Sequence, residues 1–114
     1  MTDCLFCKVA SGAIPAQIIY RDDSIIAFDD INPQAPHHKI IIPQKHIPTL
    51  NDVHDEDTEL LGHMVQSGIL LAKQLNVAQD GYRLLFNCNG HGGQSVFHIH
   101  LHLLGGRRLH WPPG

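Results

Sequence analysis

Residues 96–104 read VFHIHLHLL, and this alternation of histidines with bulky apolar residues constrains the fold more than any other stretch of the chain. Successive side chains of a strand point to opposite faces of a sheet, so the pattern predicts a strand with a histidine face and an apolar core face. The predicted histidine face carries His98, His100 and His102, and the predicted core face carries Phe97, Ile99, Leu101 and Leu103. At about 3.4 Å per residue, His98 and His102 lie about 13 Å apart, so the three cannot all bind one metal ion.

The rest of the chain predicts an α+β fold in which strands precede and follow one long helix. Four further stretches are rich in β-branched and apolar residues and end at turn residues, which is the pattern of strands. These predicted strands are residues 17–22, 25–30, 37–43 and 82–87. In the third of them, Ile40 and Ile42 share one face and Ile41 lies on the other. This order of elements indicates an antiparallel sheet packed against the helix.

Residues 55–76 are predicted to form the long helix, because apolar side chains recur there at intervals of three and four. Acidic residues crowd its first turns and Lys73 lies in its last, as the helix dipole favours. A short N-terminal helix is also predicted, with Asp3 as its N-cap and Gly12 just beyond its end.

Length and composition fit one globular domain over residues 1–114, with an irregular tail over residues 105–114. A net charge of −3 and eight basic residues leave no block that could follow a nucleic acid backbone, so any nucleotide ligand is expected to be small. No apolar run approaches the ~20 residues that cross a bilayer, and no signal peptide pattern is visible. We therefore expect a cytoplasmic protein without membrane or polymeric nucleic acid partners.

The loop before the histidine stretch indicates phosphate chemistry. Residues 88–95 read CNGHGGQS, and the backbone N–H groups of such a glycine-rich loop, with the Ser95 hydroxyl, can surround an anionic oxygen. Three histidines in step also indicate a site, because a solvated sheet face normally carries a mixture of polar residues. An imidazole with a pKa of about 6.5 can attack phosphorus while a second histidine binds phosphoryl oxygens or protonates the leaving group. The stretch thus favours covalent phosphoryl or nucleotidyl transfer over a purely metal-binding site.

The chain resembles the histidine triad (HIT) family, whose mark is His-x-His-x-His-x-x with every x apolar, and HIHLHLL over residues 98–104 fits it in full. The resemblance extends through CLFCKVASGAIPAQIIYRDD, AFDDINPQAPHHKIIIPQKHI, GYRLLFN and GGQSVFHIHLHLLGGR. It implies the HIT fold, a five-stranded antiparallel sheet packed against one long helix, with a short N-terminal helix. PQAP and the ending HWPPG look like the Hint branch, which implies a homodimer that cleaves the P–N bond of purine nucleoside phosphoramidates of the AMP or GMP type. Transferase relatives replace the third histidine with glutamine, so the presence of His102 favours hydrolysis.

The resemblance also implies roles for individual residues. His100 matches the nucleophile that forms a nucleotidyl-imidazole intermediate, and His98, His102 and His38 match the histidines around the phosphate. It implies phosphate or leaving-group contacts for Asn87, Gly93 and Ser95, ribose binding for Asp30, a purine sandwich for Phe6 and Ile31, and a leaving-group role in the homodimer for Trp111. From the residues alone, a turn cap suits Asp30 better. Core packing likewise suits Phe6 and Ile31 better.

Cys4 and Cys7 form a C-x-x-C pair, which in a chain without a secretion signal indicates metal or redox chemistry. Some HIT proteins keep both cysteines and add two histidines, at positions that match His46 and His98 here. The resemblance then implies a closed set of four ligands, which is the structural type of zinc site, with no cofactor required for catalysis. It would also occupy His98 and leave His100 and His102 for chemistry. The alternative is that both cysteines are small buried hydrophobic residues.

Three other functions stay open at this point, and one of them is a hydrolase that uses zinc in catalysis. A hydrolase of dinucleoside polyphosphates would use the same fold and the same triad. A nucleotide-binding scaffold protein would bind the same ligands with only weak activity.

Overall fold

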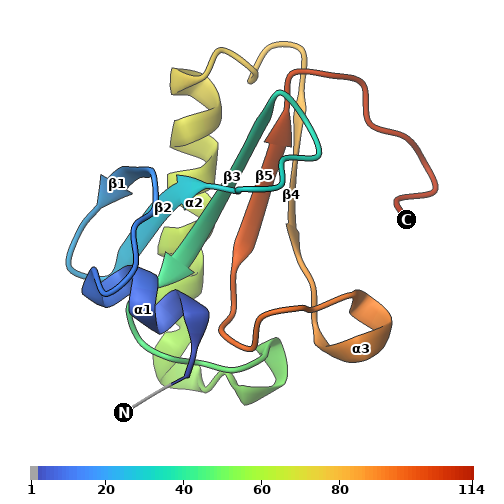
Figure 1. The fold of residues 1–114 in the computed structure, drawn as a ribbon. Helices are drawn as coiled ribbons and strands as arrows, with labels where there is room; N and C mark the ends of the chain where they lie inside the picture. The colour runs from blue at the N-terminus through green and yellow to red at the C-terminus, as the bar shows by residue number, and fades with distance from the viewer. Residues whose placement is uncertain (1–2) are drawn as a thin grey trace.

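The computed structural model describes residues 3–114, and a five-stranded antiparallel sheet runs through its centre (Figure 1). The strands lie in the order β1-β2-β3-β5-β4, and they are β1 (Ile18–Arg21), β2 (Ile25–Asp29), β3 (His37–Pro43), β4 (Tyr82–Phe86) and β5 (Leu101–Gly105). The helices are α1 (Leu5–Ser11), α2 (Thr58–Gln74) and α3 (Asn89–Gly92), with 3-10 turns η1 (Leu50–Asp52) and η2 (Asp55–Asp57). The predicted fold class is therefore confirmed. Among the helices of residues 3–114, none combines the length and the apolar character needed to cross a bilayer.

Helices cover both faces of the sheet, which explains why its central strands are apolar on both sides. On one face, Ile41 of β3 packs in a cluster with Met64 and Leu71 of α2. On the other face, Ile40 and Ile42 pack with α1 through Phe6 and Val9. The predicted division of the three isoleucines between two faces is confirmed, and all three are buried.

Two glycines of α2 differ in their surroundings and are expected to respond oppositely to substitution. A Cβ on Gly68 would lie 3.0 Å from Leu84 Cδ2 and 3.4 Å from Ile41 Cδ1, whereas a Cβ on Gly62 would meet nothing within 4 Å. Gly62→Ala is expected to stabilise the fold by about 0.5–1 kcal/mol through helix propensity. Gly68→Val is expected to destabilise it by about 1–3 kcal/mol through overpacking. Urea denaturation of both variants checks the pair, and a stabilised Gly68→Val protein would contradict it.

The helix ends differ from the predictions in detail. The prediction of Asp3 as the N-cap of α1 is wrong, because Cys4 holds that position and its sulfur accepts a hydrogen bond from the backbone N–H of Cys7 at 3.4 Å. Gly12 ends the helix in the left-handed conformation, as predicted. The long helix is shorter than the predicted range, because its first predicted turn is the 3-10 turn η2.

The histidine strand begins later than the alternation predicts, at Leu101 rather than at Val96. The reason lies in the backbone hydrogen bonds of the preceding segment. The carbonyl oxygen of Val96 accepts from the side chain of Gln94 at 3.1 Å, and the N–H of Ile99 donates to the carbonyl oxygen of Ile47 at 2.8 Å. The chain bends at residues 96–98, and Phe97, predicted for the core face, is 51% exposed.

Candidate active site and metal-ligand cluster

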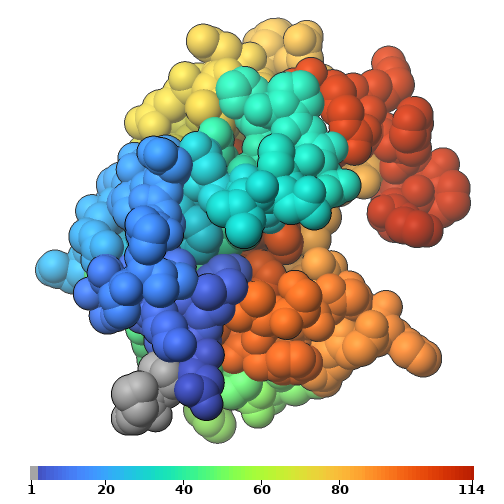
Figure 2. All heavy atoms as spheres, viewed as in Figure 1, coloured from blue at the N-terminus to red at the C-terminus, as the bar shows by residue number. Residues whose placement is uncertain are grey.

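A cavity of about 280 Å³ lies where α1, the connection between β2 and β3, and the segment leading into β5 meet. Figure 2 shows these segments, far apart in the sequence, meeting on one face of the molecule in dark blue, cyan and orange. Six predicted site residues line the cavity: Phe6, Asp30, Ile31, Ser95, His100 and His102. The apolar part of its wall includes residues that were not predicted as site residues: Leu5, Val9, Ile14, Phe28, Ile40 and Val96.

His100 lines this cavity with its proton position set by the backbone. Its Nδ1 donates to the carbonyl oxygen of His98 at 2.8 Å, so in the neutral ring Nε2 carries no proton and its lone pair is available. Phe6 meets the ring edge-on, with centroids 4.9 Å apart, and is therefore both a core residue and part of the cavity wall. Burial lowers the pKa of His100 below its ordinary value, although the hydrogen bond to His98 and the charge of Asp30 raise it. The ring is held neutral, as a nucleophile must be.

His38 and His102 form a directed pair of imidazoles beside His100. The backbone N–H of Gln34 donates to Nδ1 of His38 at 3.0 Å, so the neutral His38 ring carries its proton on Nε2. That Nε2 lies 2.8 Å from Nδ1 of His102 and 3.3 Å from a carboxylate oxygen of Asp30. His102 therefore accepts at Nδ1 and carries its own proton on Nε2, the atom left to donate to a ligand. We call this series, from the Gln34 N–H through His38 to His102, the histidine relay.

Asp30, His38 and His102 have donor atoms within 4.8 Å of one another, a spacing that could also hold a metal ion. The distance of 2.8 Å between the two histidine nitrogens is that of a direct hydrogen bond. Two nitrogens that share a tetrahedral zinc at about 2.0–2.1 Å are separated by about 3.3 Å. The arrangement thus fits proton sharing better than metal binding.

Acid is expected to destabilise the fold through His102. Burial lowers its pKa to about 4, with further lowering by His100 and His38 and partial opposition from Asp30. The unfolded chain, with a pKa of 6.5, takes up this proton at higher pH than the folded chain. The stability contributed by His102 is therefore complete above pH 6.5 and lost as the pH falls toward about 4. The expected slope is about 1.4 kcal/mol per pH unit for one proton.

Urea denaturation across this pH range measures the slope directly. His102→Gln removes the titrating group. The free energy of unfolding of this variant is therefore expected to change less steeply with pH, by the contribution of about one proton. A variant that keeps the full slope of the wild type would contradict the assignment.

The glycine-rich loop contains a helical turn and a buried glutamine that the sequence analysis did not identify. The turn α3 ends at Gly93, whose φ of 82° suits glycine. The side chain of Gln94, 7% exposed, accepts from the N–H of Asn89 at 2.8 Å and donates to the carbonyl oxygen of Pro48 at 2.7 Å. It therefore ties the loop to the chain beyond β3. A single glutamine among small loop residues carries no periodic signal that could have identified it.

The loop residues predicted to contact phosphate lie at different distances from the cavity. Ser95 is exposed and lines it, whereas Asn87 and Gly93 lie outside its lining. The N–H of Gly93 donates to the carbonyl oxygen of Gly90 at 3.0 Å, so a ligand oxygen would compete with that bond.

A second cluster lies next to the cavity and consists of Cys4, Cys7, His46 and His98, whose ligand atoms are all within 4.8 Å of one another. Nδ1 of His98 is 3.4 Å from the sulfur of Cys4, 3.5 Å from that of Cys7 and 3.2 Å from Nδ1 of His46. A tetrahedral zinc with ordinary bond lengths separates a sulfur and a nitrogen by about 3.6 Å and two nitrogens by about 3.3 Å. The donor set therefore fits a metal ion in both chemistry and spacing.

His98 joins the two sites. Its side chain is fully buried, and its Nε2 donates to the carbonyl oxygen of Pro43 at 2.8 Å, which leaves the lone pair of Nδ1 facing the cluster. Its carbonyl oxygen accepts a hydrogen bond from the N–H at Nδ1 of His100. The side chain of one residue thus belongs to the metal-ligand cluster while its backbone orients the next histidine.

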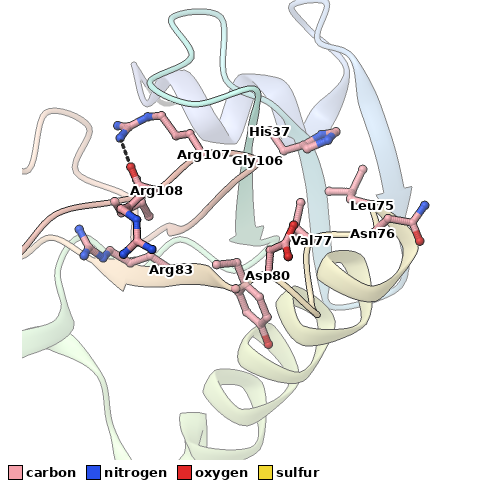
Figure 3. A pocket seen from close by; sticks show the side chains of 12 residues that line it. His37, Leu75, Asn76, Val77, Asp80, Arg83, Gly106, Arg107 and Arg108 are labelled. Atoms are coloured by element: carbon pink, nitrogen blue, oxygen red, sulfur yellow. Dashed lines mark hydrogen bonds between the residues drawn. The ribbon is translucent and has the colours of Figure 1, made fainter.

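The C-terminal tail, from Gly106 on, leaves the sheet beyond β4, on the side of the molecule opposite α1 (Figure 1). Trp111 is 83% exposed, and a single chain does not bring it into the lining of the histidine cavity. The tail borders a separate cavity of about 630 Å³ together with residues that follow α2 (Figure 3). Arg107 and Arg108 of the tail lie at this second cavity.

Comparison with known families matches residues 3–109 to the family model described as "Scavenger mRNA decapping enzyme C-term binding". The purine nucleoside phosphoramidase of Escherichia coli (strain K12) is 51% identical over 107 residues, which cover 94% of this chain and 90% of that protein.

Two solved structures resemble this one over nearly their whole length. A HIT family hydrolase from Legionella pneumophila Philadelphia 1 has a TM-score of 0.97 and 56% identity, and the alignment covers 98% of this chain and 100% of that one. A histidine triad protein from Clostridium difficile has a TM-score of 0.92 and 40% identity, with coverage of 96% and 95%. The likeness therefore extends to the sequence as well as to the fold.

Proposed function

The chain belongs to the histidine triad (HIT) family, and from this membership we propose that it is an enzyme that hydrolyses purine nucleoside phosphoramidates to the nucleoside monophosphate. The Escherichia coli relative bears the name of this activity. The observation that carries the proposal is the proton arrangement in one cavity, where His100 with an unprotonated Nε2 lies beside His102 with a protonated one. A nucleophile next to a proton donor is what cleavage of a P–N bond requires.

The reaction proceeds in two displacements at phosphorus. Nε2 of His100 attacks the phosphorus atom, the P–N bond breaks, and the leaving nitrogen takes a proton to depart as an amine. The carbonyl oxygen of His98 stabilises the positive charge that develops on the ring, because it accepts a hydrogen bond from the N–H at Nδ1. Water then attacks the same phosphorus and loses a proton, which replaces the proton that the leaving nitrogen took, the bond to Nε2 breaks, and the nucleoside monophosphate leaves with His100 restored. Nε2 of His102 donates to a phosphoryl oxygen or to the leaving nitrogen, and His38 keeps it in the donating state.

The walls of the cavity suit a nucleoside. In this proposal Asp30 binds the ribose hydroxyls, and the purine lies between Phe6 and Ile31. Ile31 is 99% exposed and Leu5 is 47% exposed where they line the cavity, so a bound base would cover apolar surface that otherwise faces water. The phosphate and the leaving group lie toward the glycine-rich loop, with contacts to Ser95, Gly93 and Asn87.

We propose that the metal-ligand cluster binds zinc in a structural role, because two sulfurs and two imidazoles are a preferred donor set of this ion. Cys4, Cys7, His46 and His98 would hold it. Bound zinc supplies folding stability there and takes no part in the reaction, because four protein ligands leave no open position. It ties α1 to the segment that presents His100.

A homodimer in the cytoplasm completes the proposal. Val65, Ile69 and Leu70 on α2 are large apolar side chains that remain exposed in the single chain, and a second copy would cover them. Trp111 of one copy would then contribute to the leaving-group side of the site. A monomeric mass by light scattering at micromolar concentration would contradict the dimer.

Incubation with adenosine 5′-phosphoramidate tests the function. AMP release followed by ³¹P NMR is expected, and the intact mass after rapid quenching is expected to increase by one nucleotidyl group. Faster cleavage of a diadenosine polyphosphate than of the phosphoramidate would favour the dinucleotide hydrolase instead. Tight AMP binding without turnover or adduct would favour the scaffold protein, and both outcomes would contradict the proposed function.

A further inference from the structure

We propose that Arg107, in the C-terminal tail, is a positioning residue for the histidine relay. Its Nε donates to the backbone carbonyl oxygen of Gln34 at 3.0 Å, while the backbone N–H of Gln34 donates to Nδ1 of His38. The tail and the relay therefore meet at one residue of the connection between β2 and β3. This inference deepens the proposed function and rests on it, because the relay serves the proposed reaction.

Two further features fix the geometry around Arg107. Nη1 of Arg107 donates to the carbonyl oxygen of Arg108 at 2.9 Å, which fixes the direction of the guanidinium (Figure 3). Gly106 has a φ of 94° and lies so close to the connection that an added Cβ would be 2.9 Å from Cβ of Pro36. The turn into the tail thus requires glycine for its left-handed backbone and for its approach to Pro36.

The connection is otherwise restrained by bonds to its own neighbours. The side chain of Gln34 donates to the carbonyl oxygen of Asn32 at 3.0 Å, and the N–H of Asn32 donates to Asp30 at 2.8 Å. Such local bonds shape the turn without anchoring it to the distant tail. The bond from Arg107 joins residues 73 apart in the chain and ends on the Gln34 carbonyl, one peptide unit after the Gln34 N–H, so it restrains the backbone at Gln34 relative to the sheet end that carries β5.

The position of Gln34, together with the Asp30 carboxylate 3.3 Å from Nε2 of His38, sets which nitrogen of His102 carries the proton. While the Gln34 N–H faces Nδ1 of His38, the His38 proton stays on Nε2 and is donated to Nδ1 of His102. If the connection moves away, His38 can carry its proton on Nδ1 and accept one from Nδ1 of His102. Nε2 of His102 then carries no proton and cannot donate to a phosphoryl oxygen or a leaving nitrogen. By holding Gln34 in place, Arg107 therefore favours the tautomers in which Nε2 of His102 carries a proton.

The test is the tautomeric state of the histidines, read from long-range ¹H–¹⁵N correlation spectra of protein with ¹⁵N-labelled histidine. The wild type is expected to show His38 and His102 protonated on Nε2. Arg107→Met is expected to show a mixture of both tautomers for the pair. Its kcat with adenosine 5′-phosphoramidate is expected to fall about tenfold, the lower end of the effect seen when a metal-ligating histidine loses its outer hydrogen-bond partner, with KM nearly unchanged.

Arg108→Met is the matched control, because it removes the same charge one residue further along while its backbone carbonyl still accepts from Arg107. It is expected to leave spectra and kcat unchanged. Gly106→Ala perturbs the same contact with Arg107 in place, and it is expected to reproduce the mixed tautomers even if Arg107→Met folds poorly. Unchanged tautomers in both Arg107→Met and Gly106→Ala would overturn the inference, as would an equal effect of Arg108→Met. The spectra need no substrate. A wild type that releases no AMP would therefore overturn the proposed function, while the tautomers of His38 and His102 could still be compared between wild type and variants.

Discussion

Replacing His100 with alanine is expected to lower kcat for adenosine 5′-phosphoramidate by about 10⁴-fold or more, the scale seen when a covalent nucleophile is removed. The ring that carries the unprotonated Nε2 disappears, and its nearest candidate substitute cannot take over. His102 lies with its ring centroid 4.9 Å from that of His100, but its Nδ1 is engaged by His38 and its Nε2 carries a proton. Initial rates of AMP release measure the loss, and the nucleotidyl adduct is expected to disappear from the intact mass.

The matched control for this substitution is His54→Ala, which removes an exposed histidine at the N-cap of η2, in the chain before α2. Its rate is expected to equal that of the wild type. AMP binding measured by calorimetry separates chemistry from binding, because His100→Ala keeps the other cavity walls and is expected to bind within about tenfold of the wild type. Retention of near-wild-type turnover by His100→Ala would contradict the assignment of the nucleophile.

Replacing Cys4 and Cys7 together with serine is expected to abolish zinc binding and lower Tm by about 10 °C or more. A site filled at a hundred times its Kd contributes about 2.7 kcal/mol to the folded state. For a chain of about 100 residues, each kcal/mol shifts Tm by about 4–8 °C. Metal analysis of protein purified without chelators is expected to give one zinc per chain for the wild type and none for the variant. Thermal unfolding followed by circular dichroism gives the Tm.

Cys88 supplies the control, because it lies at the N-cap of α3, outside the metal-ligand cluster. Cys88→Ser is expected to keep the zinc and most of the Tm. A chelator is expected to lower the Tm of the wild type and of Cys88→Ser, with activity lost only as the protein unfolds. A wild type that contains no zinc, or immediate loss of activity in chelator without unfolding, would contradict a structural role.

The sheet and the long helix could be predicted because their signals are local. Residues 37–43 contain a run of three isoleucines that ends at Pro43 and form β3 over that full range, and the three- and four-residue spacing of apolar side chains predicts α2 to within a few residues of each end. The alternation of residues 96–104 predicts the last strand less well, because Gln94 and Ile47 bind backbone groups that a ladder would need. A period-two pattern shows neither the side-chain bond of Gln94 nor the carbonyl oxygen of Ile47, which lies far from Ile99 in the chain.

The sequence by itself determined which kinds of residue make up the site. The three alternating histidines, the glycine-rich loop and the C-x-x-C pair are short patterns whose chemistry follows from residue type and spacing. The cavity joins several of these residues to Phe6 and Asp30, and the comparisons assign the family. Nothing in the spacing shows which nitrogen of each histidine carries its proton.

Only the tertiary structure decided that point, because the deciding groups are backbone atoms that the folded chain brings to each ring. The carbonyl oxygen of His98 accepts a hydrogen bond from Nδ1 of His100, and that of Pro43 accepts one from Nε2 of His98, so each bond fixes the position of a ring proton. The N–H of Gln34 and a contact across 64 residues set the protons of His38 and His102. Backbone amides and carbonyls are the same at every residue, so a sequence pattern carries no record of where they point, and folding alone makes the three histidines of the triad chemically different.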